Sequence, residues 1–470
     1  MGVIGQRHYL LREGYMSEDN KKLEELQQKR EARRKRRQRN QILAYSAVIA
    51  VIVAFALGVL GIIHVISNPK EPEGEVKLPG LPSEFSEAPV TEPEETEPPI
   101  ETVEVTPEPE ETEPPVVELT REQKLDEIVN AAIEVMPLED KVAGLFMLTP
   151  ELLTGVKPVT KAGDSTKTAL GKYAIGGVLY RSQNIKNKDS FKTMIDNTIQ
   201  YSRYPVFLAV EEEGGNATQI VKANLGTKTD SAKALAATGD PQNAYQAGVT
   251  IGSYLKELGI TMDLAPVADL ANVEKSLMED RSFGDDPQQV IHYVKNAMKG
   301  LEEQGITPCV KHFPGMGSVT TDTEKGVAVS ERAEADFWAG EMDLFHKLVE
   351  DGVPVIMVSN MAAPSLTGDN TPCSLSDKVV TEILRKQLSY DGLIITDALN
   401  EKAVADYHSS EEAAILALKA GCDMILCPEN FEEAYNGVLK AVQDGTISQQ
   451  RVDDALRRIY RIKFADRVTE

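Results

Sequence analysis

The stretch "PCVKHFPGMG", Pro308 to Gly317, shows the pattern that decides the fold. A short apolar run leads directly into the polar pair Lys311 and His312, and a Phe-Pro-Gly turn follows. Short apolar runs bounded by turn residues are typical of buried strands. We therefore predict a strand here, with polar side chains at the point where it leaves its sheet.

The same pattern occurs in seven further apolar runs of the chain. They are Ala143–Leu148, Ile175–Tyr180, Pro205–Glu211, Ile260–Val267, Val353–Asn360, Gly392–Asp397 and Cys422–Cys427. Stretches of helical period lie between them, such as "PQNAYQAGVTIGSYLKELG" and "EEAAILALKAG", which end in glycine as a helix C-cap does. Eight strands alternating with helices predict an α/β fold, a (β/α)8 barrel of the TIM type, with a doubly wound open sheet as the alternative.

Polar residues gather at or just beyond the ends of these runs. They are Glu211, Glu213, Asp269, Lys311, His312, Asn360 and Asp397. In a parallel barrel the carboxyl ends of all strands meet at one rim, where barrel enzymes build their active sites. The sequence therefore predicts a carboxylate-rich pocket at this rim.

Two carboxyls beside Lys and His donors, with no nucleotide or metal motif, are typical of glycoside hydrolysis. Asp397 ends the apolar run "GLIITD", so its backbone is fixed by a buried strand while its side chain faces the rim. We predict that Asp397 is the nucleophile. The alternative is an ordinary helix-capping Asp.

The first 120 residues form extensions to this domain. Ile42–Ile66 contains no Asp, Glu, Lys or Arg over 25 positions, which is long enough for a transmembrane helix. The preceding stretch "KREARRKRRQR", Lys29 to Arg39, is strongly basic, so residues 1–41 are predicted to be a cytoplasmic tail. Everything after this single-pass anchor is then extracellular.

Residues 67–120 form a Pro/Glu/Thr-rich segment that contains 12 of the 25 prolines and repeats the octamer "EPEETEPP". Such a composition predicts an extended linker without a core. The folded domain is predicted to span residues 121–470. The formal net charge of the chain is −24, which argues against nucleic acid as a partner. The four cysteines show no metal-binding spacing, and a bridge between Cys373 and Cys427 is left open.

Five blocks in order resemble the signatures of family 3 glycoside hydrolases, nearest to the bacterial β-N-acetylhexosaminidase branch. They are "EEEGG" (Glu211–Gly215), "MDLAPVADL" (Met262–Leu270), "RSFGDDP" (Arg281–Pro287), "KHFPGMG" (Lys311–Gly317) and "IITDAL" (Ile394–Leu399). The resemblance runs from about Lys141 to Pro428. It implies a barrel domain with a retaining, two-step mechanism that needs no metal or cofactor.

The resemblance also implies roles for individual residues. Asp397 matches the family nucleophile. The residues that match sugar-binding or pocket positions are Glu211, Asp269, Arg281, Lys311 and His312. A glycan that contains N-acetylglucosamine is the implied substrate.

One loop departs from that branch, which has Asp-Ser-His where this chain has Asp322-Thr323-Glu324. The histidine that serves as the general acid/base of the branch is therefore absent. Glu324 can replace it chemically, and the charge of Asp322 beside it would raise one of the two pKa values. Further departures from the family pattern are Glu212, Asn216, Met316, Asn360 and Ala398.

Two classes of function follow from these residues. The first is a membrane-anchored exo-β-N-acetylglucosaminidase that acts on cell-wall glycans, with Asp397 as nucleophile and Glu324, with Asp322, as acid/base. The alternatives are a glycan-binding or scaffold protein that has lost proton transfer, and a β-glucosidase-like hydrolase. Turnover of a substrate separates the binding protein from the enzymes.

Overall fold

The structure is a computed structural model, and it describes residues 119–468. The predicted cytoplasmic tail, transmembrane segment and most of the linker lie outside the described residues. Among the helices of residues 119–468, none is long and apolar enough to cross a membrane. The prediction of a membrane anchor therefore stays a prediction.

Eight strands lie within the eight apolar runs or begin one residue before them. They are β1 (Phe146–Leu148), β2 (Gly177–Leu179), β3 (Phe207–Val210), β4 (Met262–Asp263), β5 (Thr307–Phe313), β6 (Val355–Val358), β7 (Leu393–Thr396) and β8 (Ile425–Leu426). Each strand from β1 to β6 pairs in parallel with the next one along the chain, and β8 pairs in parallel with β1. An isolated parallel bridge between Ile395 of β7 and Met424, the residue before β8, nearly closes the barrel. The predicted parallel barrel is confirmed, and the doubly wound alternative is wrong because the strand order never reverses.

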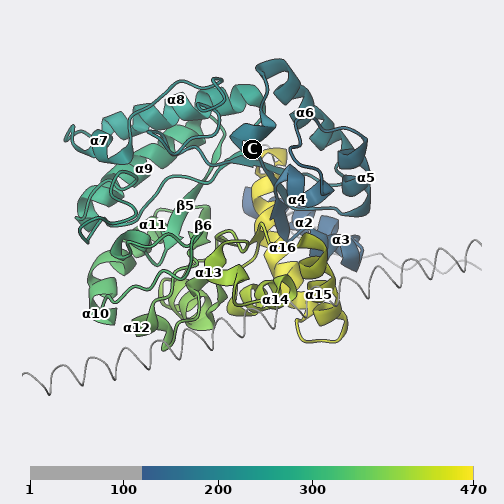
Figure 1. The fold of residues 1–470 in the computed structure, drawn as a ribbon. Coiled ribbons are helices and arrows are strands. Elements are labelled where there is room, and N and C mark those ends of the chain that lie inside the picture. The colour runs from purple at the N-terminus through teal and green to yellow at the C-terminus, as the bar shows by residue number, and fades with distance from the viewer. Residues whose placement is uncertain (1–118, 469–470) are drawn as a thin grey trace, which may run out of the picture. The chain divides into compact units, whose positions relative to one another are not determined.

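Helices surround the strands, as Figure 1 shows. The α-helices are α2 (Arg121–Glu134), α3 (Leu138–Ala143), α4 (Pro150–Thr154), α5 (Asp164–Lys172), α6 (Lys188–Tyr201), α7 (Ala232–Ala236), α8 (Gln242–Leu258), α9 (Pro287–Glu303), α10 (Glu334–Phe337), α11 (Asp343–Glu350), α12 (Pro364–Thr367), α13 (Lys402–Ala405), α14 (Ser410–Ala420), α15 (Phe431–Gln443) and α16 (Gln449–Lys463). Two π-helical segments, Trp338–Met342 and Lys378–Gln387, complete the helical layer.

Local sequence explains where the longer helices begin and end. Asp286 accepts hydrogen bonds from the backbone N–H groups of Gln288 and Gln289 and so caps α9. Helices α8 and α14 end at Gly259 and Gly421, which adopt positive φ angles of 84° and 117°. A residue without Cβ takes up this conformation without steric strain, as the sequence pattern predicts.

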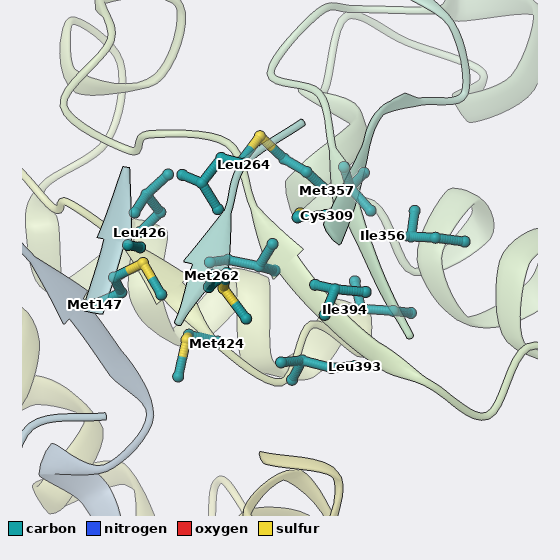
Figure 2. Packing of buried hydrophobic residues seen from close by; sticks show 14 of the residues in the cluster. Met147, Met262, Leu264, Cys309, Ile356, Met357, Leu393, Ile394, Met424 and Leu426 are labelled. Carbon is teal, nitrogen blue, oxygen red and sulfur yellow. The ribbon is translucent and has the colours of Figure 1, made fainter. Parts of the chain in front are cut away.

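The centre of the hydrophobic core lies inside the barrel. Apolar side chains from different strands pack against one another there, including Met147, Met262, Ile394 and Leu426, all almost fully buried (Figure 2). All four cysteines are free and buried, so the possible bridge between Cys373 and Cys427 is not formed. A barrel core of this kind fixes the strand ends, and these ends determine where the polar residues of the rim lie.

Candidate active site

Lys311, in β5, lies at the centre of the site. Its side chain is completely buried, and its Nζ lies 2.6 Å from Glu211 Oε1 and 2.7 Å from Glu213 Oε1. Burial alone would lower the pKa of Lys311, but the charges of the two glutamates outweigh it and raise this pKa above its ordinary value. The ends of β3 and β5 therefore meet at the rim, as the sequence predicts.

Arg281 extends this pairing through the loop after β4. Its Nε donates to Glu213 Oε2 at 2.7 Å and its Nη2 donates to Glu213 Oε1 at 2.6 Å, which is a bidentate pair. Burial would raise the pKa of Glu213, but Lys311 and Arg281 hold it well below its usual range. We call Glu211, Glu213, Arg281 and Lys311 the paired cluster.

Glu212 lies between two members of the paired cluster but has a different role. Successive residues of an extended segment face opposite sides, so Glu212 points away from Glu211 and Glu213. Its buried carboxylate accepts hydrogen bonds from the backbone N–H groups of Ile220 and Val221 at 2.9 and 3.1 Å and from the Tyr254 hydroxyl at 3.0 Å. Glu212 therefore anchors the loop that follows β3.

Asp269 orients His312 and does not itself line an open pocket. The fully buried Asp269 Oδ2 lies 2.7 Å from His312 Nδ1, and Asp269 Oδ1 accepts from the backbone N–H of Met316 at 2.7 Å. With Nδ1 held in this way, Nε2 is the ring nitrogen left to contact a ligand. Two residues that the resemblance assigned separately to the site are thus in contact, with Asp269 behind His312.

Asp397 follows β7 directly and is half-buried. Its backbone N–H donates to the carbonyl of Val358 in β6 at 2.8 Å, and its Oδ1 accepts from the backbone N–H of Ala398 at 2.8 Å. These bonds fix the backbone on the neighbouring strand and orient the carboxylate. The side chain is placed on the same rim as the paired cluster, as predicted.

The loop after β5 carries Asp322 and Glu324 toward the β7 side of the rim. It starts against the loop after β4, where a Cβ on Gly317 would lie 1.4 Å from the carbonyl oxygen of Leu270. Farther along, the backbone carbonyl of the buried Thr323 accepts from the N–H of Ala403 at 3.1 Å. The loop is therefore fixed at both places.

The two predicted acidic residues of this loop differ in their surroundings. Asp322 accepts from the backbone N–H of Glu324 at 3.0 Å and pairs with Lys325 Nζ at 3.0 Å. The side chain of Glu324 is exposed. Asp322 thus stabilises the turn, and the two carboxyl groups are not bonded to each other.

Glu401 is a site residue that the sequence reasoning missed. Its Oε2 accepts a hydrogen bond from Asn360 Nδ2 at 2.9 Å, and burial followed by the charge of Asp397 raises its pKa to about 9. The charge of Glu324 also raises this pKa, so the β7 side of the rim brings three carboxyl groups near one another. The available signal was a carboxyl residue four positions beyond the candidate nucleophile.

A cavity of about 500 Å³, lined by polar and apolar groups, borders the Glu213–Arg281 pair. The loops after β3 and β4 line it, and its charged or amide-bearing side chains include Asn216, Asp230 and Asp280. Among residues 119–468, no group of three or more His, Cys, Asp or Glu side chains is placed to hold a metal ion. The described site offers both hydrogen-bond donors and hydrogen-bond acceptors to a hydroxyl-rich ligand.

Comparison with protein families gives one match that covers most of the chain. Residues 137–462 match the family described as "Glycosyl hydrolase family 3 N terminal domain". The matched range contains all eight strands and every residue of the site.

Two bacterial proteins show the similarity in sequence. A beta-hexosaminidase from Alkalilimnicola ehrlichii is 28% identical over 302 residues, which are 63% of this chain and 86% of that protein. Beta-hexosaminidase LpqI from Mycobacterium tuberculosis is 29% identical over 338 residues, which are 69% of this chain and 82% of that protein.

Solved structures show the same relationship. A family 3 β-N-acetylglucosaminidase from Paenibacillus superposes with a TM-score of 0.67 at 27% identity and covers 72% of this chain. This chain spans 64% of the length of that enzyme. The structure of LpqI from M. tuberculosis gives a TM-score of 0.64 at 26% identity and covers 71% of this chain and 96% of that protein.

Proposed function

The chain belongs to glycosyl hydrolase family 3, and we propose that it is a retaining exo-β-N-acetylglucosaminidase. The observation that carries this proposal is the buried Lys311, which holds two carboxylates at the rim where Asp397 ends β7. The names of its bacterial relatives support the choice of N-acetylglucosamine as the sugar.

The paired cluster is suited to hold the sugar. Lys311 and Arg281 donate several hydrogen bonds without losing their charge near neutral pH, while Glu211 accepts hydrogen bonds from hydroxyl groups. A sugar bound here would replace part of the pairing and would be fixed in position by rigid groups. His312, oriented by Asp269, adds a further contact through Nε2.

Asp397 is proposed as the nucleophile. In the first step its carboxylate oxygen forms a bond to the anomeric carbon while the bond to the glycosidic oxygen breaks and that oxygen takes up a proton. In the second step, water gives up a proton and bonds to the anomeric carbon, and the ester to Asp397 breaks. The sequence predicts Glu324, with Asp322 beside it, as the proton donor of the first step.

The cellular setting is part of the same proposal. The basic stretch and the 25 uncharged positions before the linker support a single-pass anchor with a cytoplasmic N-terminus. An extended linker at about 3 Å per residue would carry the catalytic domain into a cell wall, where glycans containing N-acetylglucosamine are its proposed substrate.

A glycan-binding protein without turnover is the second candidate. The observation that favours it is the exposed side chain of Glu324, at the position where the resemblance to the β-N-acetylhexosaminidase branch leads us to expect histidine. The paired cluster would still bind a sugar in that case. A β-glucosidase-like specificity is a third possibility, which a comparison of aryl glucosides with aryl N-acetylglucosaminides tests.

The deciding experiment measures hydrolysis of an activated aryl N-acetyl-β-glucosaminide by the full chain and by Asp397→Asn. We expect the substitution to lower kcat by more than about 10³-fold, because the variant lacks the attacking carboxylate. A slow fluoro-sugar should attach covalently to Asp397. Asp406→Asn, the same change at an exposed residue nine positions away, is the control. Equal rates in wild type and Asp397→Asn, with no covalent adduct, would contradict the enzyme assignment.

A further inference from the structure

We propose that Glu401, and not Glu324, gives the catalytic proton to the leaving glycosidic oxygen. This inference deepens the proposed hydrolase function and rests on Asp397 as the nucleophile. It is carried by the position of Glu401 between the end of β7, the loop after β5 and the amide of Asn360.

The Glu401 side chain does not cap the helix that follows it. Glu401 is the N-cap residue of α13, where a side chain commonly accepts a hydrogen bond from the first turn. Here it makes no such bond. Its carboxyl group instead contacts Asn360 at the end of β6, while the Thr323 hydroxyl lies within hydrogen-bonding reach.

A chain of hydrogen bonds fixes the Asn360 amide. The Ser374 hydroxyl donates to Asn360 Oδ1 at 2.5 Å, and Asn360 Nδ2 donates both to Glu401 Oε2 and to the carbonyl of Ala398, each at 2.9 Å. The donor side of the amide therefore faces Glu401. Since Oε2 accepts this bond, Oε1 is the oxygen that can hold a proton.

The surroundings keep that proton in place near neutral pH. Burial raises the pKa of Glu401 most, followed by the charge of Asp397 at the end of β7, and the charge of Glu324 on the loop after β5 also raises it. Hydrogen bonds from Asn360 and Thr323 act in the opposite direction, and the resulting pKa is about 9. Glu401 is thus an un-ionised carboxylic acid beside the carboxyl group of the nucleophile.

Glu324 is less suited to the same task. Its side chain is exposed, and Asp322, the acidic residue two positions before it, is bonded to the loop backbone and to Lys325. An exposed side chain on a loop is not held in the fixed position that a proton donor needs in front of the glycosidic oxygen. The charge of Glu324 instead helps Glu401 to retain its proton.

The first chemical step transfers the proton from Glu401. Its Oε1–H bond breaks as the glycosidic oxygen takes the proton and leaves, while an Asp397 oxygen bonds to the anomeric carbon. Glu401 is then a carboxylate, and Asp397 is a neutral ester.

The second step reverses these roles. Esterification removes the negative charge of Asp397 and so lowers the pKa of Glu401, which favours the carboxylate form of Glu401 when a water molecule arrives. Glu401 takes a proton from this water, whose oxygen bonds to the anomeric carbon as the ester breaks. Both residues return to their starting forms.

The test compares full-length Glu401→Gln and Glu324→Gln on two N-acetyl-β-glucosaminides, one with an activated aryl leaving group and one with an alkyl leaving group. Glutamine keeps the shape and the bond from Asn360 but has no acidic proton. We expect Glu401→Gln to lower kcat/KM for the alkyl substrate by about 10²- to 10³-fold, with a much smaller loss on the activated one. Azide should accelerate turnover of the activated substrate by Glu401→Gln and yield a β-glycosyl azide.

Glu433→Gln, an exposed residue of α15, is the matched control and should behave as wild type. If Glu401→Gln cleaves the alkyl substrate within about threefold of wild type while Glu324→Gln loses this activity, Glu324 is the donor and the assignment of Glu401 is overturned. If the wild type cleaves neither substrate, the hydrolase proposal itself fails, and the assignment fails with it. Melting temperatures distinguish loss of folding from loss of proton transfer.

Discussion

The carboxyl groups on the two sides of the rim have opposite electrostatic surroundings. On the β3–β5 side, Lys311 and Arg281 pair with Glu211 and Glu213. On the β6–β7 side, the carboxyl groups of Asp397, Glu324 and Glu401 gather, and among the ion pairs within residues 119–468 none involves any of these three.

The difference teaches how one barrel rim supplies both binding and proton transfer. A buried carboxylate beside a cation stays ionised and forms a fixed hydrogen-bond acceptor, as Glu213 does. A half-buried carboxyl group beside other carboxylates keeps its proton, as Glu401 does. The first side can hold a sugar without changing its charge, whereas the second can exchange a proton.

The largest effect on folding is expected from breaking the paired side with Lys311→Met. The substitution leaves Glu211 and Glu213 without their shared cation in a buried place, so we expect the free energy of unfolding to fall by about 3–5 kcal/mol. Urea denaturation measures this change. Lys325→Met, which removes an exposed pair with Asp322, should alter stability by less than about 1 kcal/mol. Similar losses in the two variants would show that burial of Lys311 does not matter.

A smaller change in the free energy of unfolding is expected from Glu401→Gln at mildly acidic pH, and this change depends on pH. The pKa of Glu401 is about 9 in the folded chain, against an ordinary value of 4.5 that serves for the unfolded chain. The unfolded chain therefore loses its proton first, and the wild type loses stability as the pH rises from about 4.5 toward 9. Glutamine does not titrate.

We accordingly expect Glu401→Gln to equal the wild type in stability near pH 4.5 and to exceed it by about 2 kcal/mol at pH 6, with the difference still growing toward pH 8, because each pH unit between the two pKa values corresponds to about 1.4 kcal/mol. Denaturant titrations of both proteins at several pH values measure this difference, with Glu433→Gln as the control. A constant difference between pH 4.5 and pH 8 would contradict a protonated Glu401.

The smallest effect is expected from Glu324→Gln, and it concerns the pH profile of hydrolysis. Its charge contributes less to the raised pKa of Glu401 than that of Asp397, so its removal should shift the alkaline limb of kcat/KM downward by less than about one pH unit. The pH profile of hydrolysis measures the shift, and the exposed Glu331→Gln serves as the control on the same loop. Loss of the entire limb would instead mark Glu324 as the proton donor.

Periodicity in the sequence was enough to predict the strands and to place Glu211, Glu213 and Lys311 at one rim, whereas Arg281 came from the family resemblance. Eight apolar runs separated by helical stretches leave few alternatives to a parallel barrel, and residues at strand ends must then share a rim. Glu211 and Glu213 stand two positions apart, which places both on one side of an extended segment. Their contact with Lys311 of β5 follows from the fold once the strand order is known.

The roles of Asp322 and Glu401 could not be predicted in this way. The adjacency of Asp322 and Glu324 suggested mutual repulsion, but the turn directs Asp322 to the backbone and to Lys325. Glu401 resembles a helix cap in the sequence, and its use depends on Asn360, 41 positions earlier in the chain. Neighbouring strands bring those two residues together.

The sequence by itself determined the barrel, the family and the position of Asp397, because strand periodicity and local motifs are short-range properties of the chain. Only the tertiary structure decided which carboxyl group keeps a proton. That choice depends on burial and on charges contributed by β6, β7 and the loop after β5, and the sequence does not state the distances between them.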